Sequence, residues 1–93
     1  MENLMSKGKQ IKSLPSPDLN QTLSLELIGQ SIRARRTQQK LDIKTTAMLC
    51  DVSAVTLGKI ENASKGVRME SVLKVIAALG IVLTIQPWDN THD

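Results

Sequence analysis

The sequence predicts a small all-α domain of four to five helices that is followed by one β-strand. Three observations carry this prediction. Apolar residues recur at helical spacing between residues that favour helix caps, and a short helix, a tight turn and a second short helix fit the stretch from Asp42 to Asn62. A β-branched run from Ile81 to Gln86 then ends at Pro87. A chain of 93 residues has room for one such domain.

The composition limits both the core and the functional class. Trp88 is the one aromatic residue, so the core must be aliphatic. The net charge of +3 suits a polyanionic partner, although small unrelated proteins often share such a balance. The single cysteine excludes an internal disulfide, and no apolar run is long enough to cross a bilayer. We therefore expect a bacterial cytoplasmic, nucleoid-associated protein without a membrane partner.

Residues 1–22 are predicted to form a flexible basic N-terminal arm, because they combine lysines, prolines and little periodicity. Two interpretations stay open, a disordered tail and an arm that touches DNA or another protein. The segment from Gln10 to Leu14 is also compatible with a short edge strand.

The first helix is predicted from about Leu25 to Gln39, with Ser24 as its N-cap and Leu25, Ile28 and Ile32 on its buried face. Its other face carries four basic residues, and two interpretations fit them: a solvated face, or a helix that crosses a phosphate backbone. These residues are Arg33, Arg35, Arg36 and Lys40.

Two short helices follow. Asp42 is the predicted N-cap of a helix over Ile43 to Leu49, and Asp51 is expected to adopt the left-handed conformation in the turn. Ser53 then caps a helix over Ala54 to Asn62. That helix should bury Leu57 and Ile60, and its outward residues are expected to be Ala54, Val55, Thr56 and Lys59.

Gly58 lies in the middle of this third helix, where glycine costs about 1 kcal/mol relative to alanine. A cost of this size suggests close approach to another surface. The surface is either a neighbouring helix or DNA, and the sequence does not separate the two.

The last helix is predicted from about Met69 to Leu79, with Gly80 in the C′ position. Its buried stripe consists of Val72, Val75, Ile76 and Leu79.

A single strand over Ile81 to Gln86 cannot satisfy its own backbone hydrogen bonds, so we expect it to pair with the same strand of a second copy. Ile81, Leu83 and Ile85 are the predicted dimerisation residues. Trp88 is either a lid over the dimer core or an exposed anchor for a partner. The domain thus spans residues 23–88, and residues 89–93 form a polar tail.

Catalysis is not expected. His92 lies in the terminal tail, Cys50 occupies a position that needs a buried apolar residue, and no Cys/His cluster has the spacing of metal ligands. We expect neither a cofactor nor a metal.

From about Leu27 to Ile85 the chain resembles the XRE, or Cro/C1-type, helix-turn-helix family. The segments LIGQSIRARR, TTAMLCDVS, AVTLGKIEN and IAALG carry the resemblance, which implies a lambda-repressor-like domain. The chain departs from the family at four places. Asp42-Ile43 stands where Thr-Gln is frequent, Asp51 and Ala63 stand where glycine is usual, and Thr46 replaces an apolar residue.

The resemblance implies a DNA-binding role for the two short helices. Contacts to bases are expected from Ala54, Val55, Thr56 and Lys59. Contacts to phosphates are expected from Lys44, Thr45, Ser53, Asn62 and Lys65. Two copies would bind a palindromic double-stranded operator.

The strand after the last helix is similar to that of HipB-type antitoxins, which repress their own operon and bind a HipA-like kinase toxin. We therefore expect a sequence-specific repressor that acts as the antitoxin of such a module. Two alternatives stay open, a module that neutralises a partner with little DNA binding and a stand-alone phage-type repressor.

Overall fold

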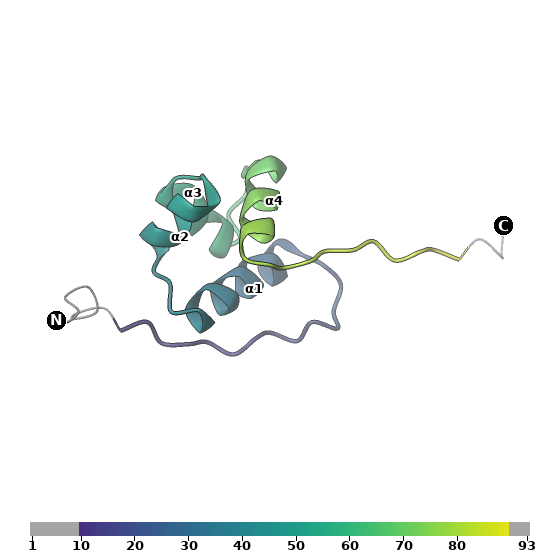
Figure 1. The fold of residues 1–93 in the computed structure, drawn as a ribbon. Helices are drawn as coiled ribbons and strands as arrows, with labels where there is room; N and C mark the ends of the chain where they lie inside the picture. The colour runs from purple at the N-terminus through teal and green to yellow at the C-terminus, as the bar shows by residue number, and fades with distance from the viewer. Residues whose placement is uncertain (1–9, 90–93) are drawn as a thin grey trace.

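The computed structural model describes residues 10–89 and contains four helices in that range (Figure 1). They are α1 (Leu25–Gln38), α2 (Ile43–Cys50), α3 (Ala54–Glu61) and α4 (Met69–Ala78). The predicted all-α domain is confirmed. The predicted ends of α1, α3 and α4 were one residue too long, because Gln39, Asn62 and Leu79 are the C-caps. The predicted end of α2 was one residue too short.

Side-chain caps start the first three helices, as the sequence predicts. The side-chain oxygens of Ser24, Asp42 and Ser53 accept hydrogen bonds from backbone N–H groups three residues later, at 3.0, 2.7 and 3.0 Å. Each cap satisfies one of the N–H groups that a helix N-terminus leaves unpaired. Arg68 precedes α4 and provides no such side-chain bond.

Left-handed residues end the helices or follow them closely. Asp51 (φ 59°) and Gly80 (φ 74°) adopt the conformations that the sequence predicts. Ala63 follows α3 with φ 57°, in the left-handed region that favours glycine. An alanine there is strained by about 1–2 kcal/mol, which the rest of the fold must offset.

The core is aliphatic, as expected, and every helix contributes to it. Its buried members are Ile28, Ile32, Ala47, Cys50, Leu57, Ile60, Val72, Val75, Ile76 and Leu79. The predicted stripe of α4 and the two predicted core residues of α3 are all among them. The prediction for Leu25 was wrong: this residue opens α1 at its outer end and is 50% exposed, while Leu27 is buried.

The N-terminal segment runs alongside α1 without forming a helix or a strand over residues 10–22 (Figure 1). Hydrogen bonds hold part of it there. Leu14 N donates to Thr37 Oγ1 at 3.0 Å, and Gln38 Nε2 donates to Leu14 O at 2.9 Å. The edge strand suggested for Gln10 to Leu14 is therefore not formed, since that backbone bonds to side chains of a helix. The rest of the predicted arm, residues 1–9, lies outside the described residues.

The C-terminal segment leaves the helices as a single extended chain (Figure 1). Ile81 still belongs to the domain, because it packs against the core and its N–H donates to Ile76 O at 3.0 Å. Beyond it the chain is exposed as far as Asp89. No strand is present within residues 10–89, and no strand of this copy lies beside Ile81 to Gln86 to pair with it. Residues 90–93 of the predicted tail lie outside the described range.

Candidate nucleic-acid interface

The position of α3 is set by a close contact with α1. An ideal Cβ added to Gly29 of α1 would lie 2.5 Å from the carbonyl oxygen of Glu61 and 2.7 Å from that of Ile60. A methyl group does not fit between α1 and the backbone at the end of α3. Gly29 thus lets the two helices approach closely, and the sequence analysis missed this residue.

Glu61 fastens the same end of α3 to α1. Its carboxylate is fully buried and accepts from Arg36 Nε at 2.6 Å and from Arg36 Nη2 at 3.0 Å. Arg36 Nη1 also donates to Leu41 O at 2.8 Å, in the connection to α2. One buried guanidinium therefore joins α1, the start of the helix pair and the end of α3. Such two-point bonds between charged groups are strong and fix orientation.

Two interpretations were open for the basic face of α1, a solvated face and a helix that crosses a phosphate backbone, and the burial of Arg36 fits neither. Arg36 is buried, Arg33 Nε bonds to Glu61 Oε1 at 3.1 Å, and Arg35 Nε donates to Leu79 O at 2.9 Å. These bonds carry two of the guanidinium groups to the buried carboxylate of Glu61 and the third to the carbonyl of Leu79, the C-cap of α4. Lys40 is exposed and its Nζ donates to Ile11 O at 3.1 Å.

The outer face of α3 is available for a partner. Ala54, Val55 and Lys59 are exposed, and Thr56 is half-buried. Ser53 Oγ accepts from Thr56 N and donates to Thr56 Oγ1, both at 3.0 Å. The hydroxyl proton of Thr56 is therefore free to donate to a partner outside the chain. The single hydroxyl proton of Ser53 is already donated to Thr56, so a phosphate would have to compete with Thr56 for it.

Gly58 has no neighbour that explains it within the chain. A Cβ built on it meets no atom within 4 Å. Packing against a neighbouring helix, one of the two interpretations of this glycine, is therefore not observed. Close approach to DNA stays a prediction.

The start of α2 differs from the usual pattern of related sequences in a way that the structure explains. Ile43 is half-buried and packs against the core, so it is not available to bind phosphate. The carboxylate of Asp42 caps the helix and offsets the positive end of its dipole. Lys44 and Thr45 are exposed in the first turn and are the polar groups left to meet a phosphate.

Three exposed polar residues lie around the connection from α3 to α4. Arg33 Nη2 donates to Asn62 Oδ1 at 3.0 Å, which orients the amide and leaves its NH₂ group to donate. Lys65 is exposed in the connection itself. Arg68 is exposed beside the uncapped N-terminus of α4, and the sequence analysis missed it. The sequence contains a signal for Arg68: the predicted start of the last helix has no Ser, Thr, Asp or Asn to cap it, and Lys65 and Arg68 precede it.

A helix-turn-helix family model of the XRE type matches residues 32–84, which is more than half of the chain. The chain belongs to this helix-turn-helix family. A search of curated protein sequences gave no match.

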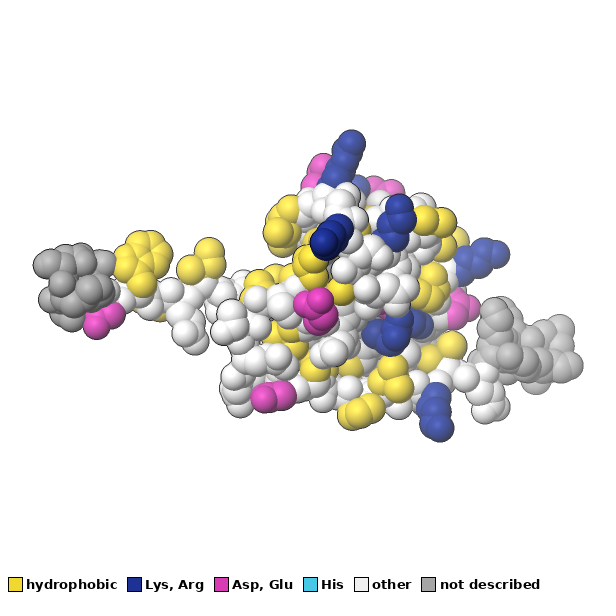
Figure 2. All heavy atoms as spheres, turned by 180° about the vertical axis from the view of Figure 1, so that it is seen from behind, with side chains coloured by type: hydrophobic (Ala, Val, Ile, Leu, Met, Phe, Trp, Pro, Cys, Tyr) yellow, Lys and Arg dark blue, Asp and Glu magenta, His cyan; other side chains and the backbone are white. Residues whose placement is uncertain are grey.

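The helix-turn-helix domain carries its basic side chains spread over its surface, and several project from the face seen in Figure 2. Among residues 10–89 no group of three or more His, Cys, Asp or Glu side chains could hold a metal ion. Burial raises the pKa of the Cys50 thiol, which favours the neutral thiol over the thiolate. No helix of the described part is long and apolar enough to cross a membrane.

Proposed function

We propose that this protein is a dimeric repressor that binds its own operator and inserts α3 into the major groove. The outer face of α3 supports the proposal best. Ala54 and Val55 are exposed in its first turn and Lys59 in its last turn, on a helix whose end is fixed to α1 by Glu61. A rigid helix with small outward residues fits the requirements of direct readout in the groove.

The individual contacts follow from side-chain chemistry. The methyl groups of Ala54 and Val55 suit the C5 methyl of thymine, and Lys59 suits the acceptors of guanine. The hydroxyl of Thr56 has a proton to donate. Lys44, Thr45, Ser53, Asn62 and Lys65 are all exposed and would hold phosphates, and Arg68 extends this set. Such contacts add affinity and salt dependence more than sequence choice.

The experiment compares binding to the promoter region of the protein's own gene and to an unrelated duplex at two salt concentrations. Lys59→Ala and Thr56→Ala should each reduce the free energy of binding to the operator by about 1–3 kcal/mol and reduce the protein's preference for the operator over the unrelated duplex. Lys44→Ala should weaken binding to both duplexes and lower the slope of log affinity against log salt concentration by about 1. Lys74→Ala removes the same charge from α4 and is the matched control. Its Nζ bonds to Asp51 Oδ2 at 3.3 Å in an exposed pair, so thermal unfolding should show that this variant keeps the stability of the parent. If Thr56→Ala and Lys59→Ala both bound the two duplexes as the parent does, α3 would not be the reader.

The dimer of this proposal pairs Ile81 to Gln86 with the same segment of a second copy, in antiparallel orientation. Leu83 is 40% and Ile85 is 89% exposed, so both have apolar surface to bury, whereas Ile81 already packs on its own core. Removing residues 82–93 keeps Ile81 in place. We expect the truncated protein to have the mass of a monomer by light scattering. It should also lose operator affinity, because the two half-sites of the operator would no longer be bound by two linked copies. A truncated protein that stayed dimeric would refute the strand pairing.

We further propose that the protein is the antitoxin of a HipA-like kinase toxin, located in the cytoplasm and without catalytic activity of its own. The extended segment after α4 supports this, through the resemblance to HipB-type antitoxins. A neighbouring reading frame for a kinase-like protein that copurifies with this chain is the expected result. A gene that stands alone or lies within a phage would instead favour a stand-alone repressor.

The second candidate is a module that binds and neutralises a partner while DNA binding is weak. Met48 and Leu49 of α2 favour it, because they are 78% and 64% exposed and lie on the outside of the helix pair. Met48→Ser with Leu49→Ser should then abolish the complex with the partner. Under the repressor proposal, these changes leave operator affinity within a few fold of the parent.

A further inference from the structure

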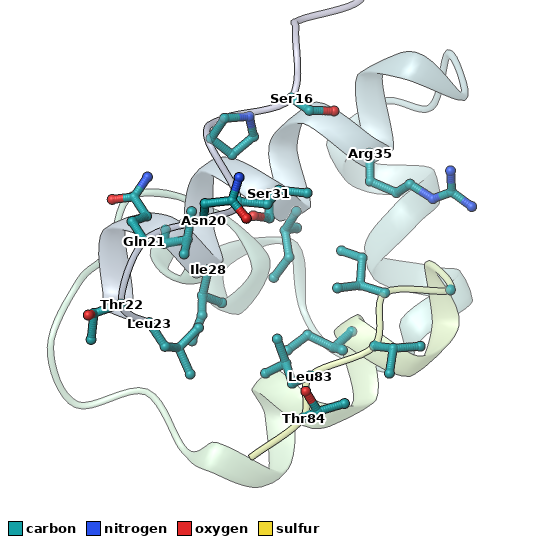
Figure 3. Close-up of a pocket in the computed structure, with 18 of the residues that line it drawn as sticks. Ser16, Asn20, Gln21, Thr22, Leu23, Ile28, Ser31, Arg35, Leu83 and Thr84 are labelled. Atoms are coloured by element: carbon teal, nitrogen blue, oxygen red, sulfur yellow. The ribbon is translucent and has the colours of Figure 1, made fainter. Parts of the chain in front are cut away.

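A groove of mixed apolar and polar lining lies between the N-terminal segment, α1 and the start of the C-terminal segment (Figure 3). Its volume is about 970 Å³. Leu27, Ile28 and Ile76 lie at its floor, all of them buried members of the domain. Residues 16–23 and residues 80–84 form its two walls. The groove is part of neither the α3 face nor the α2 face described above.

The chain that forms one wall of the groove carries apolar surface with no cover. Val82 is 79% exposed, Ile85 89% and Trp88 74%. These side chains stand along the segment that projects from the domain, where Figure 2 shows exposed hydrophobic groups. An indole buries about 150–250 Å² when it is packed, so exposure of Trp88 leaves a large apolar area in water.

The proposed pairing determines where this indole goes. In a two-fold antiparallel pair, one residue faces its own copy across the axis, and for a strand over Ile81 to Gln86 that residue is Leu83 or Thr84. Counting outward, the partner residue opposite Gly80 is Trp88 if the centre is Thr84 and Gln86 if the centre is Leu83. In both registers the partner's Trp88 therefore lies near the C-terminal end of α4, where this copy's strand begins. Gly80 lines the groove, so the end of the partner's segment arrives at the groove's mouth.

Arg35 is placed to receive an indole there. Its Nε donates to Leu79 O at 2.9 Å, and its Nη2 lies 3.4 Å from where a Cβ of Gly80 would be. The guanidinium is thus held beside Gly80, and Arg35 is an exposed residue. A fixed guanidinium plane is a good surface on which an indole can stack.

We infer that the groove of each copy binds the partner's Trp88, with Arg35 stacked against the indole. The two sites are reciprocal, and each is incomplete without the second copy. The inference rests on the dimer proposed above and adds a specific contact to it. The contact between Trp88 of one copy and the groove of the other, here called the latch, would fix the angle between the two domains.

The single tryptophan is also the probe. With no Tyr or Phe in the chain, the fluorescence excited near 290 nm reports Trp88 alone. In the full-length dimer, emission should be blue-shifted and quenching by acrylamide several-fold weaker than for N-acetyltryptophanamide. Dilution to the monomer should reverse both in step with the mass from light scattering.

A mixing experiment tests the contact between copies. Arg35→Ala should raise quenching while the protein stays dimeric, and Arg35→Lys should restore protection only in part. Adding an excess of the non-fluorescent variant Trp88→Leu, which keeps Arg35, should protect the indole of Arg35→Ala again, because mixed dimers offer it an intact groove. Thermal unfolding of each variant controls for loss of folding, and Ser31→Arg, which obstructs the groove from α1, should reproduce the effect of Arg35→Ala.

The possible outcomes distinguish the proposed dimer from the proposed Trp88 contact. A dimer whose Trp88 is quenched as fast as the free indole overturns the latch and leaves the dimer intact. Protection that persists in the monomer also overturns it, because the indole then sits in its own chain. A protein that stays monomeric at every concentration overturns both the dimer and the latch.

Discussion

Arg36→Met should lower the free energy of unfolding by about 3–5 kcal/mol, which is the usual effect of removing one member of a buried ion pair. Arg36 is 7% exposed, and the carboxylate that it binds is completely buried. Without the guanidinium, Glu61 and Leu41 O lose their buried donor. A domain of this size has only about 5–15 kcal/mol of stability in total, so the change removes a large part of it. Urea unfolding followed by circular dichroism measures the difference.

Two variants show whether burial is the cause. Arg33→Met removes the neighbouring cation on the same carboxylate, but the Arg33 side chain is 43% exposed and Arg36 keeps its two bonds to that carboxylate. The loss should therefore be much smaller than for Arg36→Met, nearer the roughly 1 kcal/mol of a surface pair. Replacing the pair together, as Arg36→Met with Glu61→Leu, should recover much of the loss because no buried charge is left alone. Equal losses for Arg33→Met and Arg36→Met would contradict this account.

The helices could be predicted from the sequence because local signals determine them. Ser24, Asp42 and Ser53 act on N–H groups three residues away, and the left-handed turn at Asp51 depends on that residue itself. The outward face of α3 followed from the same local periodicity. Exposure of Ala54, Val55 and Lys59 agrees with it, although no structural contact tests their roles at DNA.

The contacts that position α3 could not be predicted in this way. Arg36 and Glu61 lie 25 residues apart, and their pairing depends on the angle at which α1 crosses α3. Arg36 comes four residues after Ile32 and eight after Ile28, so a helical wheel places it beside the buried face. The sequence analysis grouped it with the other basic residues because of its charge, and no local signal showed that Glu61 would be its buried partner. Local sequence also cannot specify which strand pairs with Ile81 to Gln86, because the proposed partner strand belongs to another copy.

Gly29 and Gly58 provide the clearest contrast between a glycine required by the fold and one that the fold does not explain. Gly29→Ala should destabilise the protein by at least about 1–3 kcal/mol, because its methyl group would overlap backbone oxygens of Glu61 and Ile60 that cannot rotate away. Gly58→Ala should stabilise it by up to about 1 kcal/mol, because the position is helical and the space around it is open. Chemical unfolding of the two variants beside the parent measures both changes.

The same pair of variants decides why Gly58 is present. If α3 lies in the major groove with its backbone close to DNA, Gly58→Ala will bind the operator more weakly although the free protein is more stable. Opposite signs of these two effects cannot come from a folding defect, so they would place the glycine at the DNA surface. A Gly58→Ala protein that gained stability and kept its affinity would show that no partner approaches α3 at this point, and would move the closest contacts to the N-terminal half of the helix.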